Sequence, residues 1–117
     1  MTEIEKMFEN VGVELVADAK FPTKDVNYNV GYPPFTAEKQ LELIKWLAKI
    51  YELSINWEKQ YNSYRFEIRD YRNGRLNHSV CCYEEPFEET LAYLINRIWK
   101  DLTDQEKEEI RRILNEK

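Results

Sequence analysis

Hydrophobic residues recur at helical spacing in four stretches of the chain, and between two of these stretches they alternate as in strands. Near the N-terminus and again after residue 36, apolar positions follow the i, i+3, i+4 pattern of one helix face. They are Ile4, Met7, Phe8 and Val11 in the first stretch and Leu43, Trp46, Leu47 and Ile50 in the second. Thr36 is a favourable N-cap for the second stretch. The pattern predicts a short helix within the first twelve residues and a longer one after Thr36.

Residues 53–83 show period-two alternation, which is typical of strands with one buried face. The apolar members are Leu53, Ile55 and Trp57, then Tyr64, Phe66 and Ile68, and the third run extends from Leu76 to Tyr83. The link between the second and third runs contains Asn73-Gly74, the strongest short hairpin signal, and residues 60–63 fit a first turn. A three-stranded antiparallel meander is therefore predicted.

Two more helices follow the strands. Pro86 suits a first helical turn, and apolar residues then recur at helical spacing. They are Leu91, Leu94, Ile95, Ile98, Trp99 and Leu102. Thr103 and Glu106 have the spacing of a capping box, which predicts a last helix carrying Ile110, Ile113 and Leu114.

Residues 12–35 fit neither period, because Pro22, Gly31, Pro33 and Pro34 interrupt them. A connection of this length either packs over the core as an arm or serves a function. We predict one α+β domain, in which residues 1–35 form a helix and an arm and residues 36–117 form an α-β-β-β-α-α core.

Composition agrees with a single globular domain, since the 117 residues are 43% hydrophobic and 14% aromatic. Adjacent Cys81 and Cys82 would point to opposite faces of a strand, which disfavours a disulfide. The N-terminus MTEIEKMFEN has no apolar signal region, and the longest apolar runs fall short of the ~20 residues of a membrane span. We expect a cytoplasmic protein.

The order from Thr36 to Trp99, a helix, three strands and a helix, is that of a double-stranded-RNA-binding domain. Such domains hold phosphates with basic residues at the start of the second helix. Here that segment reads Glu84-Glu85-Pro86-Phe87-Glu88-Glu89, whose four carboxylates would repel a phosphate backbone. The likeness is therefore one of element order only.

A basic surface could instead form on the second strand and the hairpin after it. Its candidates for binding nucleic acid are Arg65, Arg69, Arg72 and Arg75, with Tyr71 as a stacking residue. The alternative is a solvated sheet face on which Arg65 and Arg69 pair with Glu67 or with carboxylates across the strands.

No catalytic or metal-binding motif is present. There is no glycine-rich phosphate loop, nucleophile elbow or His-Glu-x-x-His segment. His78, Cys81 and Cys82 lack the paired spacing of a zinc site, and His78 lies on the order of 13 Å from Cys82 along a strand. We expect a protein without enzymatic activity, cofactor or metal.

Acidic residues concentrate at the C-terminal end. Residues 84–117 hold ten acidic and six basic residues, and the whole chain carries a net charge of −5. The candidate acidic surface comprises Glu84, Glu85, Glu88, Glu89, Asp101, Asp104, Glu106, Glu108 and Glu109. Such residues either solvate helix faces or, together with exposed Tyr and Trp, bind a partner whose surface is basic.

The segments YPPFTAEKQLELIKWL (residues 32–47) and WKDLTDQEK (residues 99–107) resemble small proteins of phages and prophages of low-GC Gram-positive bacteria. The resemblance implies a phage origin and transfers no active-site residues, because that family has no assigned chemistry. We therefore expect an inhibitor of a host nucleic-acid-handling or defence protein, such as a CRISPR effector. The alternative is a nucleic-acid-binding accessory protein that uses the arginines named above.

Overall fold

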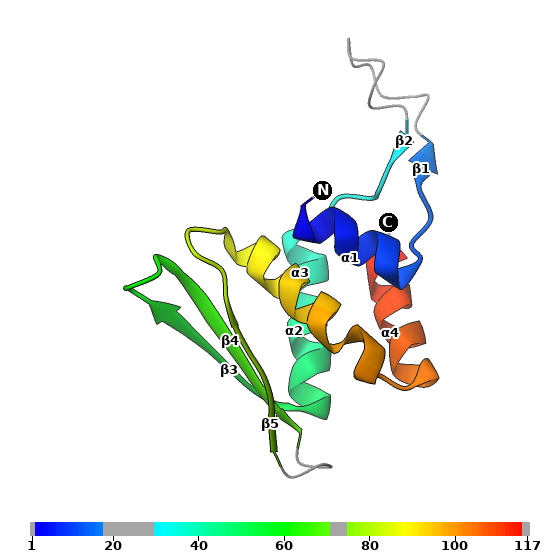
Figure 1. Cartoon of the computed structure of the whole chain (residues 1–117). Coiled ribbons are helices and arrows are strands. Elements are labelled where there is room, and N and C mark those ends of the chain that lie inside the picture. The colour runs from blue at the N-terminus through cyan, green and yellow to red at the C-terminus, as the bar shows by residue number, and fades with distance from the viewer. Residues whose placement is uncertain (1, 18–29, 71–74, 116–117) are drawn as a thin grey trace.

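The computed structural model describes residues 2–17, 30–70 and 75–115 and shows the predicted single α+β domain (Figure 1). The helices are α1 (Glu3–Val11), α2 (Ala37–Ile50), α3 (Phe87–Ile98), the short 3-10 helix η2 (Trp99–Asp101) and α4 (Asp104–Asn115). The strands are β1 (Val16–Ala17), β2 (Val30–Gly31), β3 (Glu52–Glu58), β4 (Ser63–Asp70) and β5 (Arg75–Cys81). A helix, a β-meander and C-terminal helices thus follow one another in the predicted order.

The three long strands form an antiparallel sheet in the order β3-β4-β5, which confirms the meander. Its register pairs Ile55 with Phe66 and Phe66 with Val80, so one face carries a row of apolar side chains. Residues one position away point to the other face, which is polar. The turn between β3 and β4 is formed by residues 59–62, one residue earlier than predicted, because Ser63 already pairs with Glu58.

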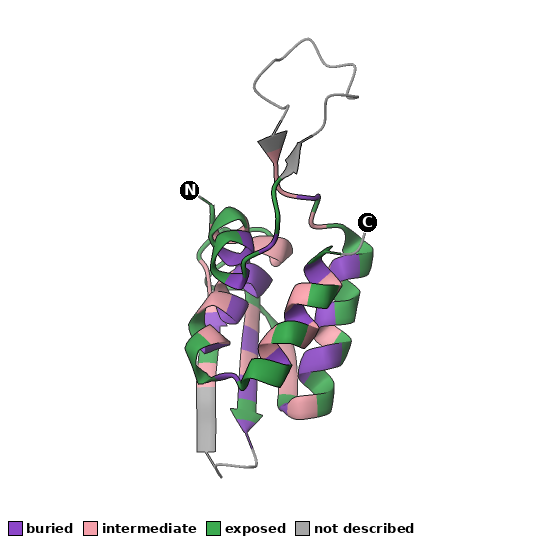
Figure 2. Cartoon of the chain, turned by 90° about the vertical axis from the view of Figure 1, so that its right-hand side faces the viewer, coloured by how far each residue is buried: buried purple, intermediate pink, exposed green. Residues whose placement is uncertain are grey.

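The helices cover the apolar face of the sheet in layers. In Figure 1, α3 crosses the sheet, and α1 lies on the side of α3 that faces away from the strands. Helix α4 packs against both α1 and α2. Buried residues lie on the helix faces that turn toward one another, and exposed residues lie on the outside (Figure 2). The centre of the core consists of Leu43, Leu47, Phe66, Ile68, Leu91, Leu94, Ile95, Ile98, Ile110 and Leu114.

Helix α1 is part of this core. Met7, Phe8 and Val11 are buried, as the helical spacing predicts, and the ring of Phe8 stacks on Tyr32 with 5.3 Å between centroids. The helix ends at Gly12, whose φ of 80° lies in the left-handed region that glycine adopts without strain. Beside this glycine, the Arg111 side chain of α4 donates to the Val11 carbonyl at 2.8 Å. This hydrogen bond joins α1, near the N-terminus, to α4, near the C-terminus.

The predicted caps occur at their residues. The Thr36 hydroxyl accepts a hydrogen bond from the Lys39 amide at 3.2 Å. Thr103 and Glu106 form the reciprocal capping box, with distances of 3.2 Å to the Glu106 amide and 2.9 Å to the Thr103 amide. Pro86 is the N-cap of α3, one position before the first helical residue.

Within residues 12–35, the structure places one short antiparallel pair, β1 with β2, which lies apart from the main sheet (Figure 1). Residues 18–29 and the predicted Asn73-Gly74 turn lie outside the described residues. In the described part of the chain, every helix is too short or too polar to cross a membrane.

Candidate protein-binding surface

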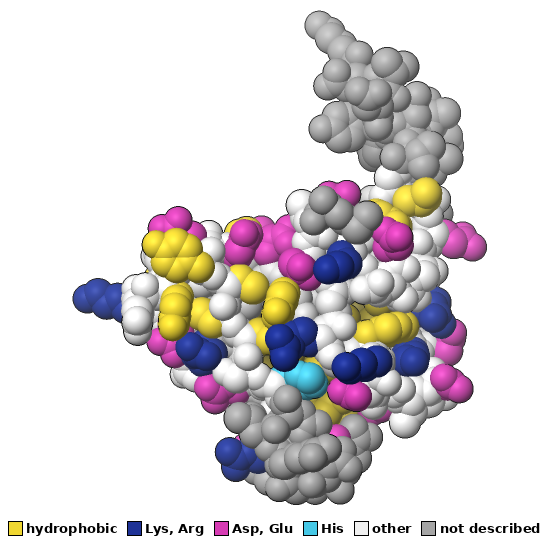
Figure 3. Space-filling model, in the orientation of Figure 1, with side chains coloured by type: hydrophobic (Ala, Val, Ile, Leu, Met, Phe, Trp, Pro, Cys, Tyr) yellow, Lys and Arg dark blue, Asp and Glu magenta, His cyan; other side chains and the backbone are white. Residues whose placement is uncertain are grey.

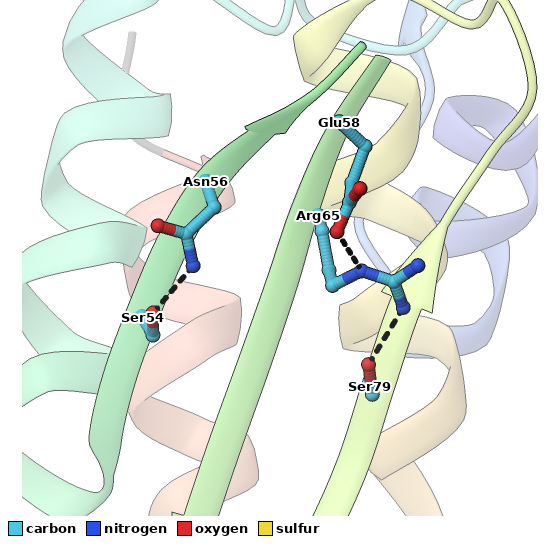
Figure 4. A network of polar contacts seen from close by, with 5 residues as sticks. All are labelled: Ser54, Asn56, Glu58, Arg65 and Ser79. Atoms are coloured by element: carbon cyan, nitrogen blue, oxygen red, sulfur yellow. Dashed lines mark hydrogen bonds and ion pairs between the residues drawn. The ribbon is translucent and has the colours of Figure 1, made fainter. Parts of the chain in front are cut away.

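Arg65 is held within a polar network on the outer face of the sheet (Figure 4). Its Nε donates to Glu58 Oε1 at 2.7 Å, and one of its terminal nitrogens donates to Ser79 Oγ at 3.1 Å. The hydrogen bond with Glu58 raises the pKa of the guanidinium, because it favours the charged form. Its guanidinium carbon also lies 5.9 Å from the ring centre of Tyr61. Arg65 therefore pairs with a carboxylate across the strands, as one of the two interpretations of this face requires.

The other residues of the predicted nucleic-acid surface are less closely defined. Arg69 is exposed on the same face of β4 as Arg65. Tyr71 and Arg72 lie outside the described residues, and Arg75 opens β5 with a side chain that also lies outside them. On this face Arg65 contacts Glu58, whereas Arg69 lies four residues further along β4, opposite Glu52.

Five of the nine predicted acidic residues make polar contacts within the fold. Glu106 is buried in its capping box, and Glu108 forms an ion pair with Arg111. Asp101 lies 3.6 Å from the His78 ring, and Glu109 accepts a 2.7 Å hydrogen bond from the Trp46 indole, which lowers the pKa of that carboxyl. The fifth, Glu89, binds the start of α1. Asp101, Glu109 and Glu89 thereby join separate elements, whereas Glu106 and Glu108 act at the start of α4 and within it.

Glu89 caps a helix that lies far from it in the sequence. Its Oε2 accepts a 2.9 Å hydrogen bond from the Glu3 amide, one of the amides that α1 cannot satisfy internally. Nearby, Asn96 of α3 donates to the Glu3 carbonyl at 3.1 Å. Burial raises the pKa of the Glu89 carboxyl, and the amide hydrogen bonds oppose this shift. Helix α3 thus holds α1 by polar contacts as well as by packing.

Two substitutions of Glu89 test its hydrogen bond to α1 and the titration of its carboxyl separately. Glu89→Ala leaves the α1 amides without their acceptor and is expected to lower the free energy of unfolding by about 1 kcal/mol, as for other lost caps. The pKa of the Glu89 carboxyl is higher in the folded chain than in the unfolded chain. Its titration therefore contributes fully to stability below the unfolded pKa, and this contribution is lost as pH rises through the folded pKa. Glu89→Gln removes this titration and keeps an acceptor.

Urea unfolding across the acidic to neutral range measures both variants. The stability of wild type relative to Glu89→Gln should fall as pH rises above the ordinary glutamate pKa. A constant difference at every pH would show that the carboxyl titrates alike in the folded and unfolded chains. Equal stability of Glu89→Ala and wild type would show that the cap contributes nothing.

The remaining acidic residues lie at the two ends of α3. Glu84 and Glu85 are exposed in the turn between β5 and α3, and Glu88 is half-exposed in the first helical turn. Asp104 is exposed at the start of α4, beyond the other end of α3. Twelve residues of helix span about 18 Å, so the predicted acidic surface divides into separate groups.

Aromatic side chains are exposed beside the first of these groups. Trp57 is 53% exposed, and its ring meets Tyr64 edge-on with 5.1 Å between centroids. Tyr64 in turn meets Phe87, the first residue of α3, edge-on at 5.2 Å. Phe87 packs at 5.1 Å against buried Phe66. A continuous row of rings thus leads from the core to the surface.

The two turns at this end of the sheet are bound to each other. The Glu84 amide donates to the Tyr61 carbonyl at 3.0 Å, and the buried Ser63 hydroxyl donates to the Glu85 carbonyl at 3.1 Å. Residues of these turns, of the adjoining strand ends and of the first turn of α3 therefore lie at one end of the sheet. We call them the hairpin-end surface, which comprises Trp57, Tyr61, Tyr64, Tyr83, Glu84, Glu85 and Glu88.

Hydrophobic and acidic side chains are visible next to one another at the hairpin end of the molecule in Figure 3. Six large hydrophobic residues of the described chain are well exposed, and four of them belong to this surface. Sequence reasoning placed Trp57 on the apolar face of its strand, and that placement is correct. The exposure of Trp57 went unpredicted, because the pattern does not reveal that the covering helices leave this end of β3 open.

His78, Cys81 and Cys82 are partly buried. Burial lowers the pKa of the His78 imidazole and raises the pKa of the Cys82 thiol, which keeps both groups neutral near pH 7. Both cysteines are free thiols. Within the described ranges, no three His, Cys, Asp or Glu side chains are placed to hold a metal ion.

Comparisons with protein-family models, with curated proteins and with solved structures found no match for this chain.

Proposed function

We propose that this chain is a small phage-encoded binding protein without enzymatic activity that acts in the host cytoplasm. Its partner is a host protein with a basic surface, and binding inhibits that protein. A nucleic-acid-handling or defence enzyme such as a CRISPR effector fits this description, because enzymes that hold phosphate backbones carry basic surfaces. The observation that carries the proposal is the hairpin-end surface, on which exposed aromatic rings lie beside carboxylates.

The two kinds of side chain have complementary effects in binding. Aromatic residues at the centre of an interface provide most of its affinity, because large rings lose water on binding and few rotatable bonds become ordered. Carboxylates around them attract a basic partner and accelerate association. Rings supported by the core, as Trp57 is through Tyr64 and Phe87, are already ordered before binding.

Carboxylates that are engaged in contacts of the fold are left out of the proposed partner-binding surface. Glu89, Glu106 and Glu109 are engaged with α1, with the start of α4 and with Trp46. Neutralising them would disturb the fold as well as any interface. Glu84, Glu85 and Glu88 are therefore the acidic residues of this chain that are proposed to contact the partner.

A matched pair of triple variants tests the proposal. Glu84→Gln/Glu85→Gln/Glu88→Gln removes three carboxylates from the hairpin-end surface. Glu9→Gln/Glu38→Gln/Glu42→Gln removes three from exposed positions on α1 and α2. Each immobilised protein is incubated with lysate of a low-GC Gram-positive host, and retained proteins are identified by mass spectrometry. Binding and inhibition are then measured with the purified partner at several salt concentrations.

We expect a basic nucleic-acid-handling protein to be retained by wild type and by the helix variant. The hairpin-end variant should bind it at least about tenfold more weakly, roughly 1.4 kcal/mol, and with a smaller salt dependence. Equal retention by both variants would contradict the proposal. Salt-sensitive binding of labelled nucleic acid that is lost in Arg65→Gln would favour the accessory-protein alternative instead.

A further inference from the structure

Three exposed aromatic rings of the described chain, those of Trp57, Tyr64 and Tyr83, have no described cation over them, and Trp57 is the one that carries an indole. In the described chain, cationic groups lie over Tyr61, Tyr93 and Trp99, at 5.9, 5.7 and 5.6 Å from the ring centres. None of the described cations lies over Trp57, which is 53% exposed. Among the three aromatic side chains, the indole binds cations most strongly.

The orientation of Trp57 is fixed by its neighbours without being covered by them. Trp57 and Tyr64 meet at an interplanar angle of 74°, and Tyr64 and Phe87 at 86°. Edge-on contacts of this kind hold a ring in place. The residue after Phe87 is Glu88, and Glu85 is bound through its carbonyl to Ser63, the neighbour of Tyr64. The backbone of the acidic turn is thus joined to β4 beside Tyr64, the residue whose ring contacts the exposed indole.

From this geometry we infer that Trp57 receives an arginine side chain of the partner protein, with the guanidinium stacked on the indole and the acidic turn beside it. This inference rests on the proposed function and names the group that the surface recognises. A guanidinium fits better than an ammonium, because it is planar and more weakly hydrated. A nucleic-acid base could also stack on indole, but its phosphates would meet Glu84, Glu85 and Glu88.

The test uses short acetylated peptides as probes. Tetra-arginine amide is titrated into the protein, and the Trp57 indole N–H signal is followed by nuclear magnetic resonance. Tetra-citrulline has nearly the same shape without charge, and tetra-lysine has the charge without the planar group. We expect the Trp57 signal to shift with tetra-arginine, less with tetra-lysine and not with tetra-citrulline.

Substitutions locate the contact. Trp57→Leu keeps an apolar side chain and should weaken tetra-arginine binding by about two- to fivefold, the range for an exposed cation–ring contact. Trp57→Phe keeps a weaker aromatic face and should lose less. Tyr93→Leu is the control, because Tyr93 lies on α3 outside the hairpin-end surface and Arg97 already lies 5.7 Å from its ring centre, and it should leave binding nearly unchanged.

The outcomes separate this inference from the proposed function. Equal binding of tetra-arginine and tetra-citrulline, or equal losses in Trp57→Leu and Tyr93→Leu, would overturn the role of Trp57. Partner binding would then still depend on Glu84, Glu85 and Glu88. Trp57 signals that shift with protein concentration alone would show that a second copy of the chain covers the ring, which also overturns the inference.

Discussion

Phe8→Ala is expected to lower the free energy of unfolding by about 3–5 kcal/mol, the range for a buried phenylalanine. Phe8 is 1% exposed, stacks on Tyr32 and meets Phe35 edge-on at 6.1 Å. The substitution therefore leaves a cavity where α1 meets the segment before α2. A loss of this size is a large part of the total stability of a small domain.

Chemical denaturation followed by circular dichroism measures this effect. Leu41→Ala is the control, because Leu41 is a helix residue that is 50% exposed, and it should change stability by no more than about 0.5 kcal/mol. Similar small effects of both substitutions would mean that α1 adds little to the core. In that case residues 36–117 could fold without it.

Lys39→Met is expected to lower the free energy of unfolding by about 1.5–3 kcal/mol, the range for a hydrogen bond to a charged group. The Lys39 ammonium is buried and donates to the Leu114 carbonyl at 3.0 Å. That carbonyl belongs to the last turn of α4, where a positive charge also interacts favourably with the helix dipole. Methionine keeps the apolar stem and removes both the donor and the charge.

Lys45→Met provides the comparison on the same helix. The side chain of Lys45 is 58% exposed, and its ammonium lies 3.7 Å from Glu42, an exposed pair that contributes little. Its substitution should change stability by less than about 1 kcal/mol. Equal effects at both lysines would show that the contact with Leu114 does not stabilise the fold.

The elements of this fold could be predicted because their signals are local. Periodicity, the Thr36 cap and the Thr103–Glu106 box each depend on residues within one or two turns. Contacts between distant segments left no such signal. Lys39 with Leu114, Trp46 with Glu109 and Glu3 with Glu89 join residues 75, 63 and 86 positions apart. Charge alone could not distinguish a carboxylate that caps a helix from one that faces a partner.

The hairpin-end surface is a second feature that could not be predicted from the sequence alone. Sequence reasoning named Glu84, Glu85 and Glu88 but grouped them with residues at the far end of α3. It correctly assigned Trp57 to the apolar face of its strand. The exposure of Trp57, however, depends on where the helix that covers this face begins. The position of Phe87 against Tyr64 decides this, and it follows from packing between layers.

The three tryptophans occupy three different environments. Trp46 is 8% exposed and bonded to Glu109 at the boundary of α2 and α4, Trp99 is half-buried beneath the Lys107 ammonium, and Trp57 is open to water. Indole fluorescence depends on the polarity around the ring. The protein therefore carries a native optical reporter in its helical layer and another on its outer rim, so a spectrum can distinguish loosening of the interior from events at the periphery.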